Sequence, residues 1–400
     1  MDKFQFHAPT QVLFGKDTEK QVGKLCKQYG AHKVLVHFGG HSAVKSGLID
    51  RVCTSLKEAG LEYVLLGGVV PNPLLSKIRE GVELCRKENV DFLLAVGGGS
   101  VIDSAKGIGY GLANEGDVWD YYLGQKKVTG CTPLAAVLTI AAAGSEMSNA
   151  SVVTNEDGQL KRGLSTDYCY CKFSIMNPEL TYTLPAYQTA SGCTDIIVHT
   201  LERYFTNPAT HQLELVDGIA ENLLRNVMKY VMVALDDPDN YDARAEIMWS
   251  GTLSHNDTTG DRRFGDWSCH QLEHELSGMF DVAHGAGLAA VWGSWARYVY
   301  KENAERFAQL AVNVFHVPAF EMPYNYRKAE DIALEGIEAM EMFFSSIGMP
   351  TSIHELIGRE VTEDEIKQLA HKCSFMGQRT IGQFKVLDVQ DMENIYRMAK

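Results

Sequence analysis

The sequence predicts an α/β domain built on an open parallel sheet, followed by an all-helical domain. In the first half of the 400 residues, short apolar runs alternate with stretches of helical periodicity. Such alternation is typical of a parallel sheet that crossover helices cover on both faces. After Leu184 and Pro185, strand signals become rare and long amphipathic stretches dominate. Because domains average roughly 150 residues, we expect two of them, residues 1–184 and 185–400.

In the first domain, each expected strand is an apolar run that ends in turn residues. Strands are expected at 34–38, at 63–70 and in the run that leads from Asp91 into three glycines. The intervening periodicity predicts helices at 42–59, with Ser42 as the N-cap, at 75–88 and at 101–112. In the second domain, helical periodicity predicts helices at 188–205, 211–234, 241–255, 267–277, 304–315, 327–346, 362–373 and 389–398.

Composition excludes several classes of protein. Lys and Arg total 37 and Asp and Glu total 51, which gives a formal net charge of −14. A nucleic-acid partner is not expected, because such binders carry clustered basic residues. No apolar stretch approaches the roughly 20 residues of a membrane span, and the N-terminus lacks the apolar core of a signal peptide. The nine cysteines are therefore expected to be reduced thiols in a cytoplasmic protein.

A glycine turn follows the third expected strand. Gly97, Gly98, Gly99 and Ser100 stand between that apolar run and a predicted helix, with Asp103 on the first turn of the helix. At this place in a parallel sheet, helix N-terminal N–H groups bind phosphate and glycine allows the backbone to approach it. The turn therefore predicts a Rossmann-like site for a dinucleotide. The spacing is not GxGxxG, and a tight strand-to-helix turn without a ligand is the alternative.

A second glycine pair indicates which dinucleotide would bind. Gly39, Gly40 and Ser42 follow the first expected strand, and the acidic residue that commonly holds the ribose 2′-hydroxyl is absent there. His41 and Lys45 instead offer donors for a 2′-phosphate. We therefore expect NADP(H) to be preferred over NAD(H). The alternative is that these polar residues are a solvated helix start.

Carboxylate and imidazole side chains are clustered in the second half of the sequence. Asp195 and His199 are spaced i, i+4, so both project from one helical face. His270 and His274 repeat this spacing, and His284 follows on a separate turn. One carboxylate with several imidazoles suits Fe(II) or Zn(II) and leaves a position open for a substrate oxygen.

The histidines allow two other interpretations. The run from His270 to His274 also fits the H-x-x-E-H pattern of an inverted zinc protease, with Glu273 as the base. That hydrolase would leave Asp195, His199 and the glycine turn unexplained. The remaining histidines are interpreted as structural or surface residues: His7, His32, His37, His211, His255, His316, His354 and His371.

The sequence resembles the iron-containing (group III) alcohol dehydrogenase family, in its branch of butanol dehydrogenases and NADP-dependent aldehyde reductases. The resemblance runs nearly end to end and rests on these segments: APTQVLFG, FGGHSAVKSGLID, AVGGGSVIDSAKGI, TIAAAGSEMSNASVVTN, FSIMNPELTYTLP, GCTDIIVHTLERYFT and GDWSCHQLEHELSGMFDVAHGAGLA. It implies a dehydroquinate synthase-like fold, a homodimer, and an N-terminal domain that binds the dinucleotide beside a helical metal-binding domain.

The resemblance also implies roles for individual residues. Asp195, His199, His270 and His284 match the four metal ligands, so Asp195 and His199 belong to the catalytic centre. His274 matches a histidine near the nicotinamide and substrate that is associated with proton relay. Four further residues match positions near the cofactor: Thr139, Asn149, Lys161 and Leu184.

The implied function is metal-dependent hydride transfer between NAD(P)(H) and a primary alcohol or aldehyde, such as butanol or butyraldehyde. Its expected partner is therefore a small molecule. One alternative from the same superfamily is a glycerol, polyol or polyol-phosphate dehydrogenase, because Arg262 and Arg263 could hold a phosphate. An alternative of another class is a protein that binds metal and nucleotide without turnover.

Overall fold

The structure is a computed structural model, and it describes residues 6–206, 213–260, 265–321 and 325–400. Arg262 and Arg263 lie outside the described residues. The chain divides into two compact units. The sheet unit consists of residues 7–184 and 238–252, and the helical unit consists of residues 185–237 and 253–400 together with the N-terminal end.

The sheet unit is built on a six-stranded sheet in the order β1-β8-β5-β4-β2-β3, and every pair of neighbouring strands is parallel. The strands are β1 (Gln11–Phe14), β2 (Lys33–Phe38), β3 (Glu62–Leu66), β4 (Phe92–Gly97), β5 (Leu134–Leu138) and β8 (Phe173–Met176). The central strands β4 and β5 are buried at every position. This explains their continuous apolar sequence, since both faces of a parallel sheet are covered.

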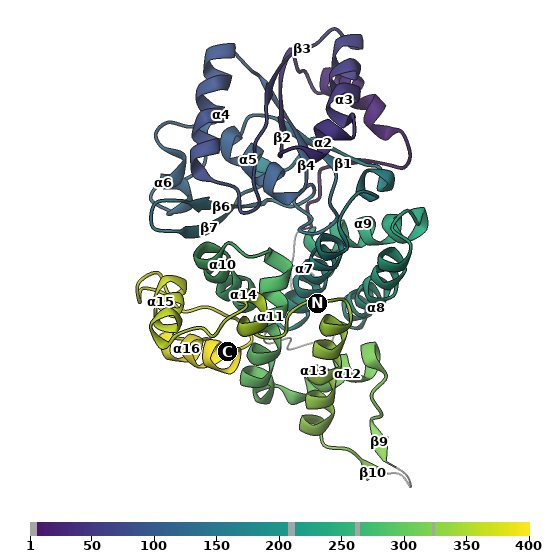
Figure 1. The fold of residues 1–400 in the computed structure, drawn as a ribbon, viewed down its shortest axis with the longest axis vertical. Coiled ribbons are helices and arrows are strands. Elements are labelled where there is room, and N and C mark those ends of the chain that lie inside the picture. The colour runs from purple at the N-terminus through teal and green to yellow at the C-terminus, as the bar shows by residue number, and fades with distance from the viewer. Residues whose placement is uncertain (1–5, 207–212, 261–264, 322–324) are drawn as a thin grey trace. The chain divides into compact units, whose positions relative to one another are not determined.

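Helices cover the sheet as the alternation of the sequence predicts (Figure 1). The unit contains η1 (Thr18–Gln21), α1 (Val22–Gln28), α2 (Ser42–Lys45), α3 (Leu48–Glu58), α4 (Leu75–Glu88), α5 (Gly99–Ala113), α6 (Val118–Tyr122), η2 (Asp167–Cys169) and η3 (Pro178–Thr181). Val52 and Leu56 of α3 pack with Val34, Val36 and Leu94 of the sheet in one apolar core. Helix α5 packs against α4, β4 and β5, so the strand side chains that point to the other face of the sheet are also covered by apolar residues.

The single helix expected over 42–59 is a wrong prediction. The structure divides it into α2 and α3, with Gly47 between them at φ 69°. This left-handed conformation suits glycine and interrupts the helical hydrogen bonding. His41 rather than Ser42 precedes the first helical residue. The expected third-strand region and the helix after it agree with β4 and α5, whereas the strand expected at 63–70 ends at Leu66.

The helical unit confirms the expected change of architecture. Its helices are α7 (Ala186–Tyr204), α8 (Glu214–Asp236), the end of α9 (Tyr241–His255), α10 (Ser268–Phe280), α11 (His284–Val299), η4 (Tyr300–Glu302), α12 (Ala304–Phe315), α13 (Ala329–Ser346), α14 (Ile353–Ile357), α15 (Glu363–Cys373) and α16 (Val389–Met398). Helix α7 packs against α8, α10 and α11 (Figure 1). No helix within the described ranges has the length and apolar character needed to cross a bilayer.

The periodicity did not predict some elements. An antiparallel hairpin of β6 (Ala150–Asn155) and β7 (Leu160–Ser165) follows β5, and a short one joins β9 (Phe320–Glu321) to β10 (Asn325–Tyr326). Helix α11 is likewise absent from the expected set. It is buried on nearly every side and rich in glycine and alanine, so its sequence lacks the polar stripe that marks a surface helix.

The buried histidine of β2 is expected to make the sheet unit sensitive to acid. His37 is fully buried, its Nδ1 lies 2.9 Å from the Leu66 carbonyl oxygen and its Nε2 lies 2.9 Å from the Ser104 hydroxyl. Burial lowers the pKa of His37 from 6.5 to about 4. The unfolded chain therefore binds a proton that the folded chain rejects between these values, and stability falls as pH drops from about 6.5 toward 4.

This histidine should contribute about 3 kcal/mol to the pH dependence of the unfolding free energy. Urea unfolding of the wild type and of His37→Gln at pH 7 and pH 4.5 measures the contribution. The wild type should lose more stability than the variant over this interval. An equal loss in both proteins would show that His37 does not carry the effect.

Candidate metal centre and nucleotide-binding turns

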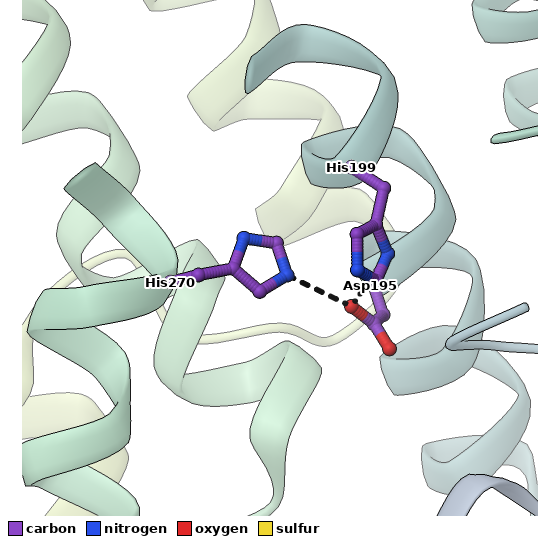
Figure 2. Close-up of side chains that lie close together, drawn as sticks. All are labelled: Asp195, His199 and His270. Atoms are coloured by element: carbon purple, nitrogen blue, oxygen red, sulfur yellow. Dashed lines mark ion pairs between the residues drawn. The ribbon is translucent and has the colours of Figure 1, made fainter. Parts of the chain in front are cut away.

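Helix α7 brings the first two predicted ligands together. Asp195 and His199 project from the same face, and the His199 Nδ1 lies 3.1 Å from the Asp195 Oδ1 (Figure 2). Only 5% of either side chain is accessible. The i, i+4 spacing therefore produces the shared face that the sequence predicts.

Helices α10 and α11 direct two more imidazoles to the same carboxylate. The His270 Nε2 lies 3.5 Å from the Asp195 Oδ1, and the His284 Nε2 lies 3.7 Å from it. Figure 2 shows the His270 ring facing Asp195 from a helix opposite α7. The structure thus brings Asp195, His199, His270 and His284 to one point, although three separate helices supply them.

The atoms that face this point are suited to a cation. Asp195 Oδ1, His199 Nδ1 and His270 Nε2 are buried and have no hydrogen-bond partner among the described residues. The Asp195 Oδ1 lies within ion-pair distance of the other two atoms, at 3.1 Å from His199 Nδ1 and 3.5 Å from His270 Nε2. Buried polar atoms are rarely left in this state, because each costs about 1–3 kcal/mol. A divalent cation bound by one carboxylate oxygen and several imidazole nitrogens would satisfy all of them.

The electrostatic environment differs between two of the proposed ligands, His270 and His199. Burial lowers the pKa of His270, but the carboxylates of Glu202 and Asp195 together outweigh burial and raise this pKa to about 9. The pKa of His199 lies well below its usual range, because of burial and the neighbouring rings of His255 and His270. A proton and a metal ion compete for the same lone pairs at such a site.

Glu202, Glu273 and His255 are parts of this site that the sequence reasoning missed. Glu202 contacts the His270 Nδ1, and Glu273 contacts the His284 Nδ1. The His255 ring centroid lies 4.3 Å from that of His199, so this half-buried histidine, which we expected to be structural or at the surface, belongs to the cluster. A signal for Glu202 was available, since it is placed seven residues after Asp195 and so returns to the same face of the helix.

His274 lies beside the cluster, next to His284 and His270. Its ring centroid is 5.8 Å from that of His284 and 6.4 Å from that of His270, and 6% of the residue is exposed. Glu273, His274 and His284 also place ligand-type atoms within 4.8 Å of one another. Because Glu273 contacts the far nitrogen of His284, we interpret this second group as the surroundings of the first.

The predicted phosphate turn joins β4 to α5. Gly98 precedes the first helical residue, Gly99, and the turn lies at the carboxyl end of a central parallel strand. A side chain at Gly98 would come within 3.1 Å of the Ile140 side chain, and one at Gly99 within 3.1 Å of Ala143. The Thr139 amide donates to the Gly97 carbonyl at 3.1 Å, so Thr139 adjoins the turn.

The second glycine turn lies near the first. β2 and β4 are neighbours in the sheet, so Gly39, which follows β2, and Gly97, which ends β4, lie at adjacent strand ends. A methyl group at Gly39 would come within 3.9 Å of the Val101 side chain, which also covers Gly97. Gly40 and Ser42 are exposed. Ligands commonly bind at the carboxyl ends of parallel strands, and both predicted turns lie there.

Asp103, another predicted cofactor residue, lies on α5 beside these turns. The Asp103 carboxylate accepts from the Ser145 hydroxyl at 2.5 Å and from the Val152 amide at 2.9 Å. The buried Lys106 ammonium donates to the carbonyls of Ser145, at 2.7 Å, and Ala150, also at 2.7 Å. Asp103 and Lys106 therefore attach the segment after β5 to helix α5.

The last three predicted residues have separate environments. The Asn149 side-chain amide donates to the Asp167 carboxylate at 3.0 Å, and the buried Lys161 ammonium donates to the Asn72 side chain at 3.0 Å. Leu184 is partly exposed at the end of the sheet unit. The structure does not bring these residues into one cluster with Gly97 by any described contact.

A glycine turn on a parallel sheet, in the same chain as a carboxylate–imidazole cluster on helices, is typical of metal-dependent dehydrogenases. Residues 9–178 match the family model described as iron-containing alcohol dehydrogenase, and residues 189–400 match the model of the C-terminal part of that family. The chain belongs to the iron-containing alcohol dehydrogenase family, whose members are oxidoreductases.

Individual relatives agree with this assignment. The chain is 36% identical to NADH-dependent butanol dehydrogenase A of Clostridium acetobutylicum and 30% identical to the NADPH-dependent aldehyde reductase YqhD of Escherichia coli, in each case over 100% of both chains. The solved structure of NADH-dependent butanol dehydrogenase A from Thermotoga maritima has a TM-score of 0.94 and 38% identity, and the match covers 100% of this chain and 99% of that one.

Proposed function

We propose that this chain interconverts primary alcohols and aldehydes, such as butanol and butyraldehyde, using a divalent metal and NAD(P)(H). The observation that carries the proposal is the convergence of Asp195, His199 and His270 through buried atoms without hydrogen-bond partners among the described residues. His284 completes the set and is its most accessible member, with 26% of its side chain exposed. A substrate oxygen would therefore approach from the His284 side.

In this proposal the two units have separate tasks, with the dinucleotide bound by residues 1–184 and the metal by residues 185–400. When bound, Fe(II) or Zn(II) supplies Lewis-acid polarisation of the substrate oxygen, and nicotinamide supplies or accepts the hydride. Asp195 and the three imidazoles hold the cation. His274 holds or releases the proton at its ring nitrogen, because a positioned imidazole can act as general acid or base. The amides of Gly98 and Gly99 hold the pyrophosphate at the start of α5.

A spectrophotometric assay tests this function. Purified protein loaded with Fe(II) or Zn(II) should oxidise NADPH at 340 nm in the presence of butyraldehyde and should reduce NADP⁺ in the presence of butanol. The protein stripped by a chelator should be inactive and should recover when either metal is restored. Metal and nucleotide binding without turnover of any short alcohol or aldehyde would instead favour a non-catalytic binding protein.

We also propose that NADP(H) is preferred over NAD(H). The support is the donor set after β2, where His41, Ser42 and Lys45 are exposed and the sequence from Gly39 to Lys45 contains no Asp or Glu. Two relatives that are 36% identical to this chain bear names that specify NADH, whereas YqhD is named as NADPH-dependent. Because relatives of both kinds occur, a comparison of kcat/KM for NADPH and NADH decides the preference of this chain.

Removing the Lys45 charge is expected to reduce this preference. A hydrogen bond to a charged group contributes about 1.5–3 kcal/mol, so Lys45→Gln should lower kcat/KM for NADPH about 10-fold and leave kcat/KM for NADH unchanged. Lys57→Gln, which alters an exposed lysine on α3, is the matched control. Equal effects on both cofactors, or preference for NADH in the wild type, would refute the role assigned to Lys45.

A polyol is the second candidate substrate. The 1,3-propanediol dehydrogenase of Citrobacter freundii is 29% identical to this chain over 92% of both sequences. The same assay with 1,3-propanediol, glycerol and a polyol phosphate beside butanol separates the candidates by kcat/KM. We further propose a homodimer, which sedimentation of the purified protein tests.

A further inference from the structure

Two buried glutamates contact two of the proposed metal ligands at the ring nitrogen that does not face Asp195. Glu202 contacts the Nδ1 of His270, and Glu273 contacts the Nδ1 of His284. Both glutamate side chains have 0% accessible surface. In each imidazole the opposite nitrogen, Nε2, is the one that faces Asp195.

Glu202 is surrounded by N–H donors on the His270 side. Besides the His270 ring, its Oε1 accepts from the backbone amides of Cys269, at 2.6 Å, and His270, at 3.3 Å. These donors come from the first turn of α10, whereas Glu202 is on α7. When the His270 ring carries its proton on Nδ1, all three groups are N–H donors, and the two acceptor oxygens of the Glu202 side chain can satisfy them together.

Glu273 has a different environment. Its Oε1 accepts from the Ser277 hydroxyl, one helical turn further along α10, while its Oε2 faces His284. Ser277 also lies 3.3 Å from the Val282 carbonyl oxygen. A hydroxyl both donates and accepts, so Ser277 can reverse its role if Glu273 is replaced by an amide.

We propose that Glu202 and Glu273 are positioning residues, which fix the ring orientation and tautomer of His270 and His284 so that both Nε2 lone pairs face the metal. This inference rests on the metal site of the proposed function. A carboxylate behind an imidazole keeps the proton on Nδ1, leaves Nε2 free to coordinate and raises its basicity. His199 differs, because it presents Nδ1 and not Nε2 to Asp195.

The two environments predict unequal effects of the same substitution. In Glu202→Gln, the amide oxygen cannot satisfy both the Cys269 amide and the His270 Nδ1–H. If the amide NH₂ faces the ring, the ring proton moves to Nε2, where it blocks coordination. In Glu273→Gln, the oxygen can remain on His284 while the NH₂ donates to Ser277, so the tautomer is preserved.

The test is Co(II) affinity, measured by competition with a chelator, together with the visible spectrum of the Co(II)-loaded protein. Replacing such carboxylates typically weakens metal binding 10–100-fold. We expect about 100-fold for Glu202→Gln with an altered spectrum, and about 10-fold for Glu273→Gln with the wild-type spectrum. Glu221→Gln is the matched control, since Glu221 is a buried carboxylate hydrogen-bonded to Tyr204 and Asn313, away from any of these histidines.

The outcomes are distinguishable. Wild-type affinity in Glu202→Gln, or losses no larger than that of Glu221→Gln, would overturn the positioning role while the metal site stands. Equal losses in both glutamate variants would overturn the tautomer argument. Failure of the wild type to bind Co(II), or full binding by Asp195→Ala, would instead overturn the proposed metal site itself.

Discussion

Asp195→Ala should abolish metal binding and turnover together. The Asp195 Oδ1 lies within 3.7 Å of one nitrogen on each of His199, His270 and His284, so every proposed imidazole ligand faces this single oxygen. Without it, a divalent cation would lose the only negative charge among its proposed ligands. Polarisation of a substrate oxygen by a metal contributes several kcal/mol to the barrier, and kcat/KM should fall by about 1,000-fold or more.

The measurement pairs metal analysis of the purified variant with the 340 nm assay. Asp195→Asn is the matched control for volume, because it keeps the side-chain shape and one oxygen while removing the charge. It should retain part of the metal and part of the rate. If Asp195→Ala kept stoichiometric metal and full turnover, Asp195 would not be a ligand, and the helical unit would need another centre.

Regular spacing made part of this site predictable. Asp195 and His199 share a face because four residues advance an α-helix by slightly more than one turn. The phosphate turn was predictable because a buried parallel strand is almost wholly apolar. The sequence of β4 is apolar until it reaches the glycines, which mark the turn. In both cases a local rule acts within one element.

The parts that depend on contacts between elements were not predictable. Glu202 and the His270 ring that it contacts are 68 residues apart in sequence. His255 reaches His199 from α9, and nothing in its neighbourhood distinguishes it from a surface histidine. The division of 42–59 depends on the conformation of one glycine, Gly47, which helical periodicity does not register.

Helix α11, which the periodicity did not predict, also depends on a contact between elements. It is the site of the second substitution for which we expect a large effect. Gly285 directly follows the proposed ligand His284 at the start of this helix. A methyl group at Gly285 would overlap the backbone carbonyl of Ser191 and come within 2.9 Å of the Ser191 hydroxyl. Ser191 precedes Asp195 by one turn of α7, so glycine is required where α11 approaches the helix that carries the ligand carboxylate.

Gly285→Ala should therefore separate α11 from α7 and move His284 away from Asp195. Overpacking of this kind costs about 1–3 kcal/mol of stability, and a displacement of about 1 Å at a catalytic group costs about 100-fold in rate. Urea unfolding, Co(II) affinity and kcat/KM measure the three consequences.

In Gly218→Ala, the control on α8, the added methyl meets no atom within 4 Å, so this exposed site should gain up to about 1 kcal/mol from helix propensity. Equal behaviour of the two variants would contradict the close contact between α7 and α11, whereas loss of metal only in Gly285→Ala would show that this contact sets the distance between His284 and Asp195.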